Sequence, residues 1–206
     1  MRIASIRTAL ACFVATMVWA AEPSFESQIT AWRQEREARL KAPDGWLSVA
    51  GLFWLKEGRN DAGSAAVPVR LPDRAPARLG VFTLTGDKVQ FDAAPGVPVL
   101  IDGKPLATAA LRDDTNGNPS VVEAAGIKLT VIHRGKRRGI RLKDNDSEFR
   151  RNFQGLSWYP PRKDWVISAR FIPHPAPRTL IFDSQTGDKQ EMRSPGIAEF
   201  EYGGSK

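Results

Sequence analysis

The 206-residue sequence has few of the residue types on which catalytic and metal sites usually depend. It contains one cysteine, Cys12, and two histidines, His133 and His174. A single cysteine forms no internal disulfide, and two distant histidines lack the ligand spacing of a zinc site. A Gly-x-Ser-x-Gly elbow and a Walker-type phosphate loop are also missing from the sequence. We therefore expect no metal and no cofactor, and leave any catalytic residue unassigned.

Long hydrophobic runs are equally scarce, and the longest lies at the start of the chain. The run from Thr8 to Val18 follows Arg2 and Arg7, has the length of a signal-peptide core, and is shorter than the roughly 20 residues that span a bilayer. We expect cleavage after Ala20 and a periplasmic or secreted mature chain without a transmembrane segment. An uncleaved anchor and a lipoprotein attached through Cys12 are the alternatives. Removing this leader lowers the formal net charge from +7 to +5, which permits anionic partners.

Residues 24–42 form the one predicted long helix, because apolar residues such as Ile29 and Trp32 recur at helical spacing. Ser24 is expected to cap the helix, and Pro43-Asp44-Gly45 ends the pattern. The stripe that contains Trp32 is expected to pack into the core.

After Gly45 the sequence changes to short apolar runs separated by turn residues, which predicts a mainly β fold. We expect the helix to be followed by an antiparallel β-sandwich or a partly open barrel, with sub-lobes at 46–125 and 126–206 and a stiff connector at 173–177. Turns are expected at 85–88, at 102–103 and at the tip 134–138. The expected strands are 67–71, 81–84, 89–91, 99–101, 127–133, 139–142, 165–172, 179–182 and 198–202.

Two longer stretches resemble a known family. The sequence GWLSVAGLFWLKEGRN at 45–60, and Arg141, Asp144, Ser147 and Arg150 with the following Phe-Gln-Gly at 153–155, are similar to motifs of domain of unknown function 1684 (DUF1684). The resemblance implies a β-rich domain behind an N-terminal helix and brings no function. It also makes the chain look short at its C-terminus. Residues 58–106 resemble, more distantly, a forkhead-associated β-sandwich, without that domain's phosphothreonine-reading residues.

The segment 143–161, KDNDSEFRRNFQGLSWYPP, has two interpretations. In the structural one, Asp146 or Ser147 caps a short helix, Phe149 and Phe153 enter the core, and Asp144 pairs with Arg141 or Arg150. In the functional one, guanidinium groups form a pocket wall for an anionic ligand, because arginine offers a fork of donors to planar oxyanions. The candidate ligand-binding residues are Arg141, Asp144, Ser147, Arg150, Arg151 and Trp158.

A hydrolase acting on an envelope or anionic substrate is the alternative function. Its candidate residues are Asp144, Ser147 and His174, with Arg141 beside them. Asp113 and Asp114 are expected at a polar hairpin tip, since the twelve-residue calcium-loop pattern is absent.

A basic island lies around the 134–138 turn and consists of Lys128, Arg134, Lys136, Arg137, Arg138, Arg141 and Lys143. It is expected either to be solvated or to contact an anionic small molecule or envelope component. Nucleic acid is not expected, because no aromatic residues alternate with the bases. The sequence therefore favours a non-catalytic ligand- or partner-binding domain.

Overall fold

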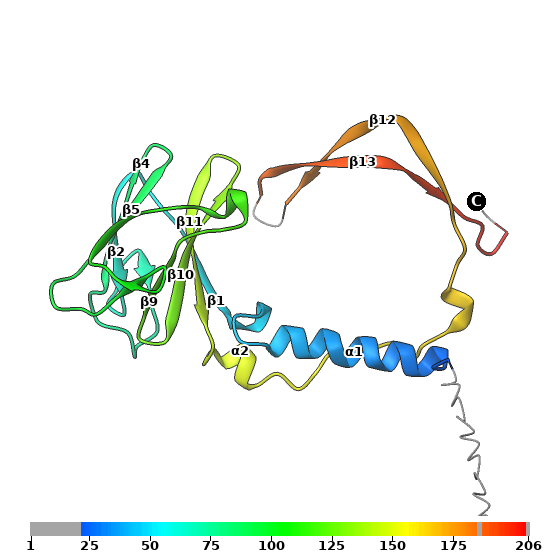
Figure 1. Ribbon diagram of the computed structural model, residues 1–206, viewed down its shortest axis with the longest axis horizontal. Helices are drawn as coiled ribbons and strands as arrows, with labels where there is room; N and C mark the ends of the chain where they lie inside the picture. The colour runs from blue at the N-terminus through cyan, green and yellow to red at the C-terminus, as the bar shows by residue number, and fades with distance from the viewer. Residues whose placement is uncertain (1–21, 185–186, 205–206) are drawn as a thin grey trace, which may run out of the picture.

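The computed structural model describes residues 22–184 and 187–204, and the expected signal peptide lies outside them. A β-sandwich follows the N-terminal helix, and a long two-stranded ribbon stands apart at the C-terminal end (Figure 1). No helix within the described residues is long and apolar enough to cross a membrane.

Helix α1 (Phe25–Lys41) confirms the predicted helix, and the Ser24 hydroxyl caps it by accepting from the Ser27 amide at 3.2 Å. The predicted burial of its apolar stripe is wrong. None of its residues is buried, and Trp32 is 47% exposed. The reason is that α1 packs on one extended segment rather than on a sheet, with Trp32 and Trp158 5.5 Å apart between ring centroids.

Two sheets form the sandwich, and their strands confirm the predicted mainly β, antiparallel architecture. All neighbouring strands are antiparallel except β2 and β3. In spatial order, the first sheet contains β1 (Val49–Trp54), β11 (Arg137–Asp144), β10 (Ile127–Arg134), β9 (Val121–Ala124), β6 (Leu100–Ile101) and β7 (Lys104–Pro105). The second contains β3 (Val69–Arg70), β2 (Gly58–Gly63), β4 (Gly80–Thr85), β5 (Lys88–Ala93) and β8 (Thr108–Leu111).

The core lies between the two sheets and is built from alternate residues of their strands. Phe82 and Phe91 of the second sheet are fully buried, with ring centroids 4.8 Å apart. Leu129 of β10 and Leu142 of β11 face them from the first sheet. Because β9 and β10 pair directly, the first sheet continues across position 125/126, where two sub-lobes were expected to meet.

The predicted hairpin turns are present where the backbone requires a positive φ. Gly86 turns β4 into β5, Asp102 and Gly103 turn β6 into β7, and Gly135 turns β10 into β11, all with φ between 52° and 74°. Glycine, and to a lesser extent aspartate, tolerates this left-handed region.

Short helical turns connect these parts: η1 (Trp46–Ser48), η2 (Asp114–Asn116), α2 (Glu148–Arg151) and η3 (Lys163–Trp165). Two of the predicted C-terminal strands need correction. Of residues 165–172, residue 165 ends η3, 166–169 form an extended link and only 170–172 belong to a strand, β12; residues 200–202 lie beyond the last strand.

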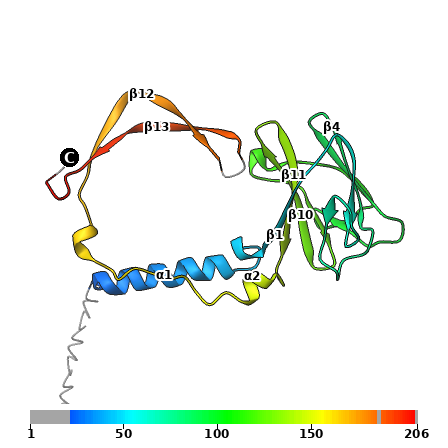
Figure 2. The ribbon, with the colours of Figure 1, turned by 180° about the vertical axis from the view of Figure 1, so that it is seen from behind.

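The ribbon consists of β12 (Arg170–Asp183) and β13 (Lys189–Glu199), which pack mainly against each other (Figure 2). The proline-rich segment 173–177 is not a connector between lobes. It lies inside β12, where the strand bulges between Pro173 and Arg178. Residues 174–177 of β12 there lie across from the single residue Pro195 of β13. This irregularity divides the ribbon into two regular stretches.

Candidate functional site

Asp144 ends β11 in a buried position and pairs with Arg74, a partner that the sequence did not indicate. Its side chain is 5% exposed, and both Arg74 terminal nitrogens donate to its carboxylate, Nη1 at 2.9 Å. The Asp146 amide donates a third hydrogen bond at 2.7 Å. Burial of the carboxylate opposes ionisation, but the Arg74 and Asp146 hydrogen bonds outweigh it and hold the pKa of Asp144 below its ordinary value. The expected pairing of Asp144 with Arg141 or Arg150 is therefore wrong, and Arg74 takes that place.

Ser147 caps α2, as one of the two predicted cap residues. Its hydroxyl accepts from the Arg150 amide at 3.3 Å and donates to the Leu47 carbonyl at 2.6 Å. The predicted burial of Phe149 is wrong, since α2 has a single turn and leaves that side chain 72% exposed. Ser147 thus ties the corner after β11 to the turn before β1.

The other predicted ligand-binding residues do not gather at one point. Arg150 donates to the Lys41 and Asn145 carbonyls, both at 2.8 Å, and so holds the end of α1. Arg151 is exposed on α2. Trp158 lies along α1, where its Nε1 donates to Glu37 at 2.7 Å.

The hydrolase candidates are also separated. Asp144 and Ser147 make the contacts given above, whereas His174 lies in β12, with Nε2 3.4 Å from the Ser194 hydroxyl. That hydroxyl donates instead to the Gly196 carbonyl at 3.0 Å. No carboxylate in the described part of the chain pairs with His174, so no base-activating acid stands behind it.

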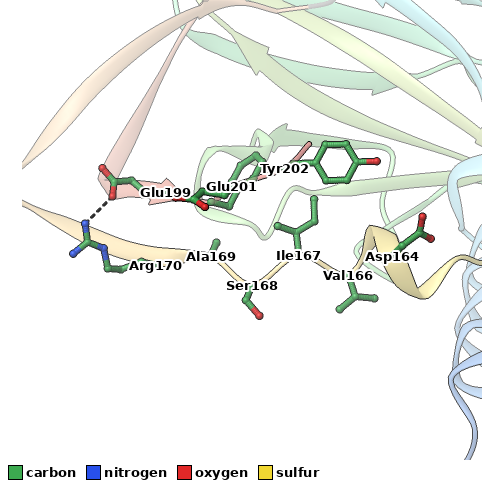
Figure 3. Close-up of a pocket in the computed structure, with 10 residues that line it drawn as sticks. Asp164, Val166, Ile167, Ser168, Ala169, Arg170, Glu199, Glu201 and Tyr202 are labelled. Atoms are coloured by element: carbon green, nitrogen blue, oxygen red, sulfur yellow. Dashed lines mark hydrogen bonds and ion pairs between the residues drawn. The ribbon is translucent and has the colours of Figure 1, made fainter. Parts of the chain in front are cut away.

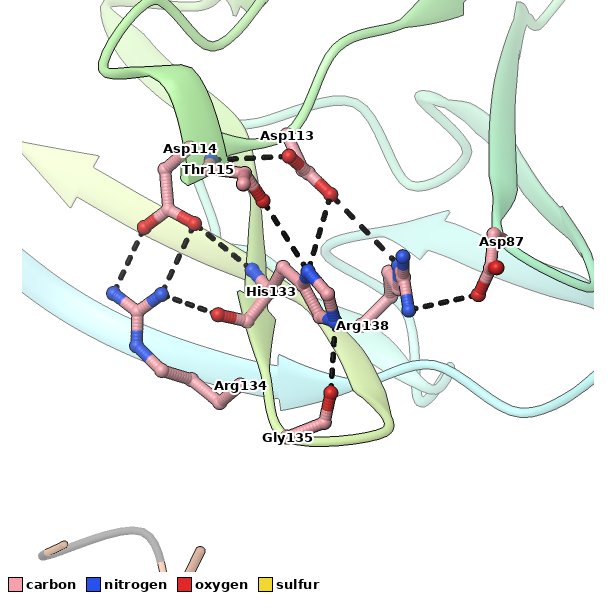
Figure 4. A network of polar contacts seen from close by, with 8 residues as sticks. All are labelled: Asp87, Asp113, Asp114, Thr115, His133, Arg134, Gly135 and Arg138. Carbon is pink, nitrogen blue, oxygen red and sulfur yellow. Dashed lines mark hydrogen bonds and ion pairs between the residues drawn. The ribbon is translucent and has the colours of Figure 1, made fainter. Parts of the chain in front are cut away.

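His133 belongs to a polar network at the end of β10 (Figure 4). Thr115 Oγ1 lies 3.2 Å and Asp113 Oδ2 3.7 Å from the same ring nitrogen, Nδ1. Nε2 donates to the Gly135 carbonyl at 2.8 Å. A hydroxyl–histidine–carboxylate relay needs its two partners on opposite ring nitrogens. The network therefore fixes the hairpin and is not arranged for nucleophilic catalysis.

A basic strip occupies the outer face of the first sheet. The core-facing residues of β10 and β11 are Ile127, Leu129 and Val131 with Ile140 and Leu142, so the alternate residues face outward. Four cross-strand pairs lie on this face in order along the two strands: Lys128 with Lys143, Thr130 with Arg141, Ile132 with Gly139, and Arg134 with Arg137. The third pair is buried, with Ile132 only 1% exposed. The strip consists of Lys128, Arg134, Arg137, Arg141 and Lys143.

Like charges directly opposite each other on a sheet destabilise it, and acidic groups relieve both ends of the strip. At one end, Asp44 pairs with Lys128 at 2.7 Å, and its carbonyl accepts from Lys143 at 2.7 Å. At the other end, Asp114 pairs with Arg134 at 2.8 Å and Asp188 with Arg137 at 3.0 Å.

Arg141, in the middle of the strip, differs from its neighbours. It is half-buried, and no hydrogen bond or ion pair joins its guanidinium to another residue in the described ranges. Glu123 of β9 lies opposite Lys128 on the same face and interacts with its charge. Five cations thus face four carboxylates, an excess of one positive charge. Burial of the Asp114 carboxylate opposes ionisation, yet its hydrogen bonds from Arg134 and the His133 amide outweigh it, and the charges of Arg134 and Arg141 add to them. Together they hold the pKa of Asp114 below its ordinary value.

A separate concavity of about 790 Å³ opens at the base of the ribbon (Figure 3). Val166, Ile167 and Tyr202 supply its apolar wall. Arg170 pairs with Glu199 at 2.7 Å across it, so these two charges neutralise each other. This concavity therefore lacks the excess positive charge of the basic strip.

Among residues 22–184 and 187–204, no group of three or more histidine, cysteine, aspartate or glutamate side chains is placed to hold a metal ion.

All five residues of the strip belong to the basic island that the sequence predicted around the 134–138 turn. Lysine and arginine alternate with apolar residues on both sides of Gly135, and a two-residue period across a tight hairpin places them on one face. No comparable signal pointed to Arg74, which is 70 positions from Asp144 in the chain.

Comparison with known proteins gives a family match over residues 151–206 and indicates no activity. A solved structure named "Rv0020c_FHA Structure" is similar at 17% identity and a TM-score of 0.30, over 45% of this chain and 95% of that one. This likeness is too low to support an inference. The comparison with curated proteins found no match. Residues 151–206 match the family described as "Protein of unknown function (DUF1684)". The resemblance to DUF1684 is therefore confirmed over residues 151–206, from the end of α2 through the ribbon.

Proposed function

We propose that the protein is an exported, non-catalytic binding domain that holds phosphate-bearing polymers or lipid head groups on the basic strip. The observation that carries the proposal is the position of Arg141. It lies half-buried among like charges, and no carboxylate of the described residues forms an ion pair with it. An anionic ligand would complete the charge balance that Asp44, Asp114 and Asp188 supply at the ends.

The shape of the strip favours an extended anion over a small molecule. Small-molecule sites are concave, whereas these cations follow two neighbouring strands. Arg137 and Lys143 are six residues apart on β11, a distance of about 20 Å in a strand. Repeating phosphate groups would contact several cations at once, and arginine forks suit phosphate oxygens.

The ends of the strip are held in place before any ligand binds. Arg137 stacks over Trp54, with 4.0 Å between its guanidinium carbon and the ring centroid, and also pairs with Asp188. Lys128 is held by Asp44. Side chains that are already ordered lose less conformational entropy on binding.

Export is part of the same proposal. Cleavage after Ala20 would place the strip in an envelope or extracellular setting, where anionic lipids and polymers are abundant.

Binding of two probes tests the proposal: soluble inorganic polyphosphate and vesicles of phosphatidylcholine with phosphatidylglycerol. Arg141→Gln should weaken binding roughly tenfold, the effect of losing one hydrogen bond between charged groups. Arg70→Gln, an exposed arginine of the second sheet, is the matched control and should bind as the wild type does. Raising the ionic strength should weaken wild-type binding.

The two probes separate the sources of phosphate. Binding to both supports recognition of repeated phosphates, and binding to vesicles alone supports a lipid surface. The proposal is wrong if the wild type binds neither probe, or if Arg141→Gln binds as tightly as the wild type.

A further inference from the structure

The ribbon is a sheet fragment with little of its own to cover it. Strands β12 and β13 contact chiefly each other, and Figures 1 and 2 show them away from the sandwich except near the turn that joins them. Several large apolar side chains of the ribbon are about half exposed or more, including Ile181 at 63% and Met192 at 57%. An isolated two-stranded hairpin is marginally stable in water, so this ribbon is suited to pairing with a further strand.

Prolines decide which part of the ribbon can accept that strand. Pro173, Pro175 and Pro177 in β12 and Pro195 in β13 lie in or beside the bulge, and proline lacks the amide that a sheet ladder needs. Beyond the bulge, the stretch 189–194 of β13 contains no proline and pairs on one side only, with 178–183 of β12. Its other edge is open to another strand.

The charge pattern of that edge is complementary to itself. Antiparallel pairing of two identical strands about a two-fold axis at Met192 places Glu191 of each copy opposite Arg193 of the other. Both side chains are exposed, and neither forms an ion pair within the described ranges. The same register places Gln190 opposite Ser194 and creates no like-charge contact. Opposite charges directly across a sheet stabilise the pairing.

The apolar residues support the same register. Leu180 lies opposite Met192 within one ribbon. Pairing two copies at Met192 therefore forms a continuous row across four strands: Leu180, Met192, Met192 of the second copy and Leu180 of the second copy. On the open edge of β12, a two-fold axis at Leu180 would place Arg178 opposite Phe182, and an axis at Ile181 would place Leu180 opposite Phe182 without pairing opposite charges.

We infer that two copies of this chain associate through the edge of β13 that is not paired with β12, with the two-fold axis at Met192. The two ribbons then form a four-stranded antiparallel sheet. This inference does not depend on the proposed ligand of the basic strip, which lies on a different sheet.

Charge exchange tests this register directly in the full chain. Sedimentation velocity and equilibrium runs should show a monomer–dimer equilibrium for the wild type. The two-fold axis creates two equivalent contacts between position 191 of one copy and position 193 of the other. Arg193→Glu puts a glutamate on both sides of each contact, and Glu191→Arg puts an arginine on both sides. Each single variant should raise the dimer dissociation constant roughly tenfold, because two attractive contacts become two repulsive ones. The double variant restores opposite charges and should return to within about threefold of the wild type.

Arg151→Glu is the matched control, since it makes the same change in net charge on exposed α2 and should dimerise as the wild type does. Circular dichroism confirms that each variant is folded. A wild type that stays monomeric at 0.2 mM overturns the inference, as do assemblies larger than a dimer or a double variant no tighter than the single ones.

Discussion

Replacing Arg74 by methionine should destabilise the fold, because it leaves the Asp144 carboxylate buried with one of its three hydrogen bonds. The two bonds from Arg74 would be lost, and the bond from the Asp146 amide would remain. Hydrogen bonds to a charged group contribute about 1.5–3 kcal/mol each. Arg74 is 37% exposed, and water screens part of this interaction. We therefore expect a loss of about 2–3 kcal/mol in the free energy of unfolding at pH 7.

Urea denaturation measures this loss, and Arg70→Met is the matched control. Arg70 is 61% exposed and reaches Asp73 only at 3.8 Å, so its removal should cost less than about 0.5 kcal/mol. A difference of less than 0.5 kcal/mol between the two variants would refute the assignment of Arg74 as the group that stabilises Asp144.

The pH dependence gives a second test of the same pair. The folded pKa of Asp144 is lowered, so its stabilising contribution is fully present above the ordinary aspartate pKa of about 3.9 and is lost as the pH falls through the folded value. The gap between wild type and Arg74→Met should therefore narrow between pH 5 and pH 3. A gap that stays constant over this range would contradict the pKa argument.

Three further predictions concern other contacts. Asn60 is 2% exposed and bonds Lys56 twice, through its backbone amide and carbonyl, at 2.9 and 2.8 Å; Asn60→Ala should cost about 2–3 kcal/mol in urea denaturation, and a loss below 0.5 kcal/mol would contradict this role. A Cβ on Gly63 would lie 2.1 Å from the Ala77 carbonyl oxygen, so Gly63→Ala should lower stability by about 1–3 kcal/mol, whereas unchanged stability would show that the backbone can move apart. Glu37 accepts from the Leu156 amide at 3.0 Å, so Glu37→Ala should accelerate hydrogen exchange at that amide by NMR, and unchanged exchange would contradict it.

Local patterns predicted the parts of the fold that depend on neighbours in the chain. Helix α1, the turns at Gly86, Asp102-Gly103 and Gly135, and the cap of α2 at Ser147 all follow from short-range chemistry. The alternation of basic and apolar residues on both sides of Gly135 likewise predicts that the cations of the basic strip share one face of the hairpin. These features require only the residues that form them.

The remaining features depend on residues that are distant in the sequence. No local pattern distinguishes an apolar helix face that meets a sheet from one that meets a single segment, so Trp32 was expected in the core. Asp144 had three nearby arginines in the sequence, and the fold instead brings Arg74 to it from before β4. The ribbon carries strand-forming residues, and only tertiary structure shows that β12 and β13 do not join either sheet.

Chemical-shift mapping of the full chain during titration with inorganic polyphosphate tests the basic strip most directly. We predict that the largest backbone amide shifts fall in β10 and β11, around Arg141, with small shifts in the second sheet. Shifts concentrated at the base of the ribbon, around Ile167 and Tyr202, or distributed evenly over both sheets, would contradict a site at the basic strip.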